Sequence, residues 1–132
     1  MKQPVRLLFL FILLLSLRNP ALSQEEFRMI GYLPYYRFNL IDSINLEGLT
    51  HVCLAFAYPD EHGIIRMEGG GVSTVVKKLK QHNIRILLSL AGGGMSSYRS
   101  RLWSFWMSPS QRFRLIQSII SYVRQHDMDG VD

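Results

Sequence analysis

Three observations in this sequence predict an α/β fold built on a parallel sheet. Two nearly continuous apolar runs, residues 49–58 and 84–90, are typical of strands that are buried on both faces. Each run is followed, farther along the chain, by a segment with apolar residues at helical spacing, residues 72–82 and 113–123. This alternation is expected when each helix crosses back over a sheet to start the next parallel strand.

The first 23 residues have the pattern of a secretory signal peptide. Lys2 and Arg6 precede an apolar run at residues 7–17 that falls short of the roughly 20 residues needed to span a bilayer. The small residues before Gln24 are of the kind that a signal peptidase reads, so we expect cleavage after Ser23. The domain is therefore predicted to comprise residues 24–132, secreted and free of the membrane after cleavage.

The composition of the secreted part argues against several classes of partner. The signal segment carries Lys2, Arg6 and Arg18 but no acid, and its removal lowers the formal net charge from +5 to +2. The remaining Lys and Arg residues do not cluster, so no nucleic-acid partner is expected. Cys53, the one cysteine, lies in an apolar run and is interpreted as a buried small hydrophobe. No spacing of His, Cys or Asp resembles a metal site, and no cofactor is expected.

Shorter signals predict the remaining elements of the first half. Residues 29–32 read as a strand that stops at Pro34, and the aromatic segment 35–38 reads as a loop. Residues 42–46 are expected to form one helical turn with an Asp or Ser cap. Residues 60–63 have the composition of a turn.

The second half is predicted to contain a long capped helix. Ser108 is expected to be the cap, with Pro109 at the first helical position and Gln111 completing a capping box. One apolar stripe then follows, made of Phe113, Ile116, Ile119, Ile120 and Val123. The helix is expected to end at residues 126–130, and Val131 to start the next strand.

Four segments at consecutive strand ends resemble glycoside hydrolase family 18, which contains chitinases, endo-β-N-acetylglucosaminidases and catalytically silent lectins. They are Ile30-Gly31-Tyr32, Ala55-Phe56-Ala57, Ser89-Leu90-Ala91-Gly92-Gly93 and Asp129-Gly130-Val131-Asp132. The third departs from the family pattern Ser-x-Gly-Gly, because Ala91 replaces the first Gly. The resemblance implies a (β/α)8 TIM barrel, which needs eight strands and about 250 residues. Residues 24–132 are therefore expected to be about its first half, strands 1–3 and the start of strand 4.

The resemblance also implies which residues carry the chemistry. The family's fourth motif reads Asp-Gly-x-Asp-x-Asp-x-Glu, and the chain ends at its second Asp, Asp132. The resemblance makes Asp132 a supporting acid, with the proton-donor Glu four residues beyond it. In this family the N-acetyl group of the substrate supplies the nucleophile, as an exception to the scheme of two protein carboxylates. Residues 24–132 alone are therefore expected to hydrolyse nothing.

Other residues are candidates for holding the sugar. Tyr32 and Phe56 are expected at the pocket floor, as sugar contacts or as barrel packing, and Ser89 as a partner of the acid series or as a plain buried serine. Gly92 and Gly93 are candidates for close approach to substrate or for a tight exit from the strand. Outer sugar contacts are expected from Tyr35, Tyr36 and Phe38. Trp103, Phe105 and Trp106 are expected on a long loop that packs onto the barrel, with a sugar subsite as the alternative role.

The expected function is hydrolysis of the β-1,4 bonds of chitin, with chitin or another N-acetylglucosamine oligosaccharide as partner. Two alternatives within the family stay open, a non-catalytic sugar-binding lectin and an endo-β-N-acetylglucosaminidase acting on N-glycans. A third reading takes residues 91–94 as the phosphate loop of an unrelated α/β protein. That segment lacks the glycine spacing of a dinucleotide site and the Lys-Ser/Thr of a P-loop.

Overall fold

The computed structural model describes residues 27–132, so the predicted signal peptide lies outside the described residues. Within this part of the chain, every helix is too short or too polar to cross a bilayer. The elements, in chain order, are β1 (Ile30–Pro34), the 3-10 helix η1 (Tyr35–Ser43), β2 (His51–Pro59), β3 (Ile65–Met67), α2 (Val72–Gln81), β4 (Arg85–Leu90), α3 (Ser97–Trp106), α4 (Arg112–Gln125) and β5 (Gly130–Val131).

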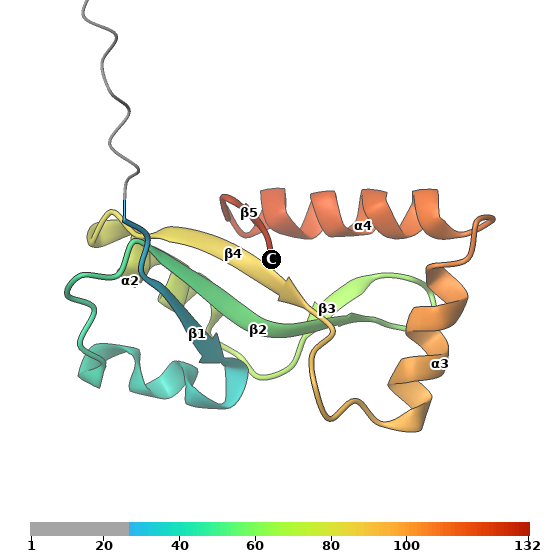
Figure 1. Cartoon of the computed structure of the whole chain (residues 1–132), viewed down its shortest axis with the longest axis horizontal. Helices are drawn as coiled ribbons and strands as arrows, with labels where there is room; N and C mark the ends of the chain where they lie inside the picture. Colours follow the sequence, from blue (N-terminus) through green and yellow to red (C-terminus); the bar gives the residue numbers. More distant parts are fainter. Residues whose placement is uncertain (1–26) are drawn as a thin grey trace, which may run out of the picture.

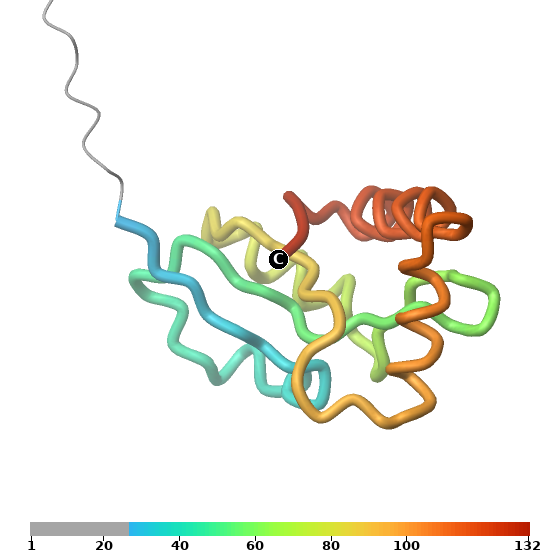
Figure 2. Tube along the Cα trace, turned by 45° about the vertical axis from the view of Figure 1, so that its right-hand side comes forward, coloured from blue at the N-terminus to red at the C-terminus, as the bar shows by residue number. Residues whose placement is uncertain are grey.

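The predicted parallel sheet is confirmed. Its strand order is β1-β2-β4-β5, and each neighbouring pair in this order is parallel. The short strand β3 pairs antiparallel with the end of β2 and extends the sheet there. Figure 1 shows β1, β2 and β4 as neighbouring arrows with α2 behind them. The trace in Figure 2 shows the last residues returning to the side of β4, where β5 pairs.

The core lies between the sheet and its helices. Alternate strand residues such as Leu54, Ile86 and Leu88 are fully buried there. These strand residues pack against the apolar stripe of α2, whose members are all buried: Val72, Val75, Val76 and Leu79. The helix ends just before Asn83, which adopts a left-handed conformation with φ 55°.

The predicted start of the last helix is wrong by three residues, because the helix begins at Arg112 and not at Pro109. The carbonyl of Ser108 accepts hydrogen bonds from the amides of Gln111 and Arg112, at 3.0 and 2.9 Å, which makes residues 108–111 a turn before α4. The Ser108 hydroxyl lies 3.3 Å from the Ser110 hydroxyl, and Gln111 makes no side-chain cap bond. The capping box therefore does not form, because the Ser108 side chain is directed to Ser110.

The predicted stripe of α4 is also partly wrong. Phe113 is 71% exposed and Ile116 is 44% exposed, whereas Leu115 is 1% exposed. Residues Ile119 and Val123 do pack against the core, as predicted. The buried face is thus centred on Leu115 and Ile119, and Phe113 and Ile116 form a second apolar strip beside it. Spacing alone shows that α4 has apolar faces but not which of them meets the sheet.

Two elements replace predicted loops. The helix α3 carries Trp103, Phe105 and Trp106, which were expected on a long loop. It begins with Ser96, whose hydroxyl accepts a hydrogen bond from the Arg99 amide at 3.3 Å. The aromatic segment 35–38 belongs to η1, which ends at Ser43, so the expected capped turn at 42–46 does not form.

The Trp106 side chain packs α3 against the turn between β2 and β3. Figure 1 shows α3 at the right of the molecule, beside this turn. Its side chain is 4% exposed, and its indole nitrogen donates to the carbonyl of Asp60 at 3.1 Å. A Cβ atom at Gly63 would lie 2.8 Å from the indole ring, and Gly63 has a φ of +77°. Only glycine fits this position without displacing Trp106.

Replacing Gly63 by alanine should therefore lower the free energy of unfolding by about 2 to 4 kcal/mol, through left-handed strain and overpacking. Gly70→Ala is the matched control, since a Cβ there meets nothing within 4 Å. Urea denaturation followed by circular dichroism measures both. Equal unfolding midpoints for the two variants would contradict the packing of Trp106 against Gly63.

Candidate active site

The polar side chains of interest lie on the sheet face opposite the helices. Tyr32, Cys53, Leu87 and Gly130 are paired across the four parallel strands, so they form one row. Because strand side chains alternate between faces, this row lies opposite the one that packs on α2. The next row on this face holds Ser89, two residues after Leu87 on β4, and Asp132, two residues after Gly130.

Asp132 joins three strands at this face. Its Oδ2 atom accepts a hydrogen bond from the Tyr32 hydroxyl at 2.8 Å and another from the Ser89 hydroxyl at 2.8 Å. Its own amide donates to the carbonyl of Leu88 at 2.9 Å, which continues the ladder between β4 and β5. The structure thus brings Tyr32, Ser89 and Asp132 together, from positions up to 100 residues apart in the sequence.

The carboxylate changes the acidity of Tyr32. Its hydrogen bond to Asp132 is the main reason that the pKa of Tyr32 is raised from 10.0 to about 12, because ionisation would remove the donated proton and set a phenolate beside a carboxylate. Burial and the nearby Cys53 add to this effect. Tyr32 therefore stays a neutral donor to Asp132 across the physiological pH range.

Cys53 lies in the same row, beside Tyr32. It is 1% exposed, which confirms the interpretation as a buried small residue. Burial is the main cause that raises the pKa of its thiol, and the charge of Asp132 adds to it. Within residues 27–132 no group of three or more His, Cys, Asp or Glu side chains is placed to hold a metal ion.

Phe56 and Gly92 are in close contact at the edge of this site. The pairing of β2 with β4 shifts between Leu54 and Ala57, so Ala55 and Phe56 together oppose the single residue Ser89. A Cβ atom at Gly92 would lie 2.8 Å from the Phe56 ring, and the φ of Gly92 is +113°. Gly92 therefore makes room for Phe56, whereas a Cβ at Gly93 would meet nothing within 4 Å.

The aromatic residues proposed as outer sugar contacts have different fates. Phe38 is 4% exposed and belongs to the core, so its prediction as a sugar contact is wrong. The reason is that η1 turns Phe38 toward the sheet, where it packs with the core residues. Tyr35 packs against the core and stands over Gly69. Tyr36 is 68% exposed and is free to contact a ligand.

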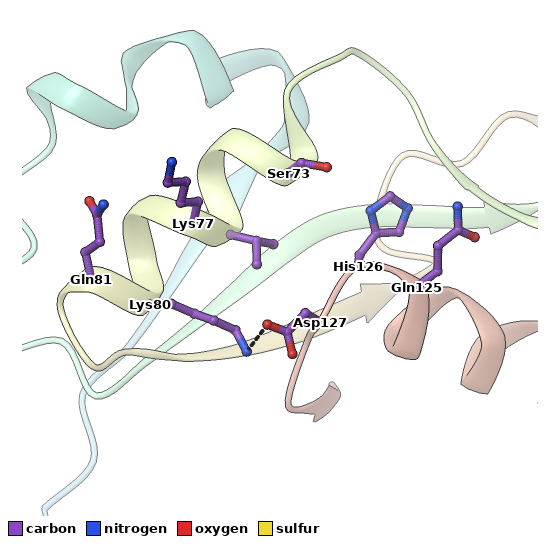
Figure 3. A pocket seen from close by; sticks show the side chains of 8 residues that line it. Ser73, Lys77, Lys80, Gln81, Gln125, His126 and Asp127 are labelled. Carbon is purple, nitrogen blue, oxygen red and sulfur yellow. Dashed lines mark ion pairs between the residues drawn. The ribbon is translucent and has the colours of Figure 1, made fainter.

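A cavity remote from this cluster has a volume of about 570 Å³ and lies between α2 and the end of α4 (Figure 3). Ser73, Lys77 and Gln81 line it from α2, and Lys80 closes one side through a 2.8 Å ion pair with Asp127. Tyr32, Ser89 and Asp132 are not among the residues that line this cavity.

The sequence reasoning named Tyr32, Ser89 and Asp132 but missed two features of the cluster. It did not predict that Tyr32 and Asp132 bond directly, nor that Cys53 lies beside them. Strand alternation orders the side chains within each strand, but it does not relate Cys53 on β2 to Ser89 on β4. The register between neighbouring strands decides which residues form a row, and it cannot be predicted from the sequence of one strand alone.

Comparison with known proteins gives a consistent result. The family "Glycosyl hydrolases family 18" matches residues 28–132. The GH18 chitinase ChiB from the chitin utilization locus of Flavobacterium johnsoniae is 38% identical, with a TM-score of 0.75 over 80% of this chain and 35% of that one. A chitinase from Bacteroides thetaiotaomicron is 29% identical, with a TM-score of 0.65 over 80% and 34%.

A more distant likeness concerns the fold alone. The GH18 chitinase from Cycas revoluta, solved in complex with (GlcNAc)3, is 24% identical, with a TM-score of 0.66 over 78% of this chain and 32% of that one. The present chain thus spans about a third of the length of these solved chains. No curated protein matches it.

The Tyr32–Asp132 bond can be tested by titration. In an Asp132→Asn variant, the pKa of Tyr32 should fall from about 12 toward its ordinary value of about 10, because the carboxylate charge is removed. The ultraviolet absorbance of phenolate, compared with a Tyr32→Phe background, measures it. Asp127→Asn, at the end of α4, is the control and should leave the titration unchanged. An unaltered Tyr32 titration in Asp132→Asn would disprove the contact.

Proposed function

This chain belongs to glycosyl hydrolase family 18, and on that premise we propose that the protein hydrolyses β-1,4 bonds between N-acetylglucosamine units of chitin. Its sheet and helices are part of a (β/α)8 barrel, of which β1, β2, β4 and β5 are consecutive barrel strands. The observation that carries the proposal is the cluster of Tyr32, Ser89 and Asp132 on the sheet face opposite the helices. Ser89 is the last residue but one of β4, and active sites of such barrels lie at the carboxyl ends of the strands.

The role proposed for Asp132 follows from strand geometry. In the family pattern Asp-Gly-x-Asp-x-Asp-x-Glu, the acids after Asp132 stand two and four residues further along. Side chains spaced by two share a face, so these acids would stand in one line with Asp132 above the sheet. We assign Asp132 to hold and tune the next acid, while Tyr32 and Ser89 fix the orientation of its carboxylate. The last acid, the Glu, would protonate the leaving oxygen.

The proposed reaction is retaining and assisted by the substrate. The N-acetyl carbonyl of the sugar in the cleaved position attacks its own anomeric carbon, so the protein needs no carboxylate nucleophile. The acids beside the proton donor then orient the acetamide during this attack. The requirement for an N-acetyl group limits the substrate class to N-acetylhexosamine polymers. Chitin is favoured within this class because the relative at 38% identity is a chitinase from a chitin utilization locus.

The donors to Asp132 should matter less for activity than Asp132 itself. We expect Asp132→Asn to lower kcat/KM by at least about a hundredfold, as for groups that support general acid catalysis. Tyr32→Phe and Ser89→Ala each remove one of two donors, and each should lower it by about tenfold. The assay is release of reducing ends from chitin oligosaccharides by the protein as encoded, with any sequence that follows Asp132.

The matched control for this series is Asp127→Asn, which removes an acid that pairs with Lys80 outside the site. It should retain the parent rate. Binding of chitin oligosaccharides without release of reducing ends would point instead to a sugar-binding protein of the same family. Release from N-glycan cores but not from chitin oligosaccharides would point to an endo-β-N-acetylglucosaminidase. A parent rate in Asp132→Asn would contradict its assigned role.

We also propose that the protein is secreted, on the pattern of residues 1–23. The mature protein recovered from the medium should begin at Gln24, because the small residues before it suit a signal peptidase. Amino-terminal sequencing of that protein measures the cleavage point. A mature chain that retained Met1 would contradict the proposal.

A further inference from the structure

A second group of polar side chains lies at the other end of the parallel strands. Arg28 precedes β1, Thr50 and His51 stand at the start of β2, and Arg85 is the first residue of β4. They line a cavity of about 220 Å³, here called the basic notch, together with Leu49 and Asn83. The notch is at the end of the sheet where β1, β2 and β4 begin, and Figure 1 shows these strand starts. Asp132 is at the opposite ends of the strands, so the notch is separate from the proposed active site.

The sheet register brings these residues together. Ile30 pairs with His51, and His51 pairs with Arg85, so β1, β2 and β4 begin at the same level. The residues that begin or precede these strands therefore share one edge, although they come from three separate segments of the chain. The Arg85 amide donates to the Thr50 carbonyl at 3.0 Å, which fixes the two neighbouring segments relative to each other.

The charges that line the notch are all positive. Arg28 and Arg85 supply two guanidinium groups, and no Asp or Glu is among the lining residues. Among residues 27–132, neither arginine takes part in an ion pair. Two acids near this edge of the sheet have other partners. Asp129 accepts from the Ile86 amide at 2.8 Å, and Asp127 pairs with Lys80 at 2.8 Å.

Hydrogen bonds of the Thr50 side chain join the start of β1 to His51. The Thr50 hydroxyl donates to the carbonyl of Met29 and accepts from the Met29 amide, both at 3.0 Å. It also lies 2.8 Å from Nδ1 of His51, so the imidazole ring is held at the mouth of the second strand.

We propose that the basic notch binds a small oxoanion, phosphate or sulfate. The two guanidinium groups offer the forked donor geometry that matches such oxygens, and Asn83 and His51 add polar side chains to the lining. No lining carboxylate opposes the anion. The binding does not depend on the proposed hydrolysis, since it uses the amino ends of the strands.

The test is equilibrium dialysis of the full chain against radiolabelled inorganic phosphate, with sulfate as the competitor. This measurement reads binding whatever the association state of the chain. We expect saturable binding of about one phosphate per chain, displaced by sulfate. Arg28→Gln and Arg85→Gln should each weaken the affinity by about tenfold, because each removes one charged donor. Arg101→Gln is the matched control, since Arg101 is exposed on α3 and loses the same charge.

Two results would overturn the proposal. One is the absence of saturable phosphate binding at millimolar concentrations. The other is an equal loss of affinity in Arg101→Gln and Arg28→Gln, which would show attraction to net charge alone. Arg28→Gln keeps the test decisive if Arg85→Gln fails to fold, because Arg28 is exposed and precedes β1. Far-ultraviolet circular dichroism verifies the fold of every variant.

Discussion

The shared register of the four parallel strands is the constraint on which the rest of this structure depends. Because Tyr32, Cys53, Leu87 and Gly130 stand in one row, the side chains two positions further, Ser89 and Asp132, also stand side by side. The alternate residues of the same strands are apolar and lie under α2 and η1. A slip of one residue between two strands would exchange these faces, burying the carboxylate against the helices. The apolar core therefore fixes the position of Asp132.

Close packing at the strand ends adds to this constraint. The irregular pairing of β2 with β4 sets Phe56 against Gly92, where a side chain would collide with the ring. Beyond the end of β2, Trp106 holds the β2–β3 turn through the Asp60 carbonyl and the space left by Gly63. These contacts tie the loops that follow β2 and β4 to the sheet. The loops that follow β2 and β4 are therefore held in place beside Asp132 by the packing of the core.

Much of this arrangement could be predicted from the sequence, because its signals are periodic. The runs that became β2 and β4 and the stripe of α2 are long enough to be unambiguous, and the motif residues Tyr32, Ser89 and Asp132 were all named. The failures are local or depend on tertiary contacts. The strand β3 is too short to show an alternating pattern. Ser108, predicted to cap the last helix, instead begins a turn before it. Which apolar face of α4 is buried, and that η1 turns Phe38 inward, depends on where the sheet lies.

The central claim is that Asp132 belongs to a line of acids rising along one strand toward a proton donor. Reading the coding sequence for the four codons after Asp132 tests it most directly. The account predicts an Asp two residues and a Glu four residues beyond Asp132, on the same face of the strand. An Asp followed by a different residue in place of the Glu would contradict the proposed catalysis and leave a sugar-binding protein of the family. A stop codon directly after Asp132 would contradict both the line of acids and the hydrolysis proposed for it.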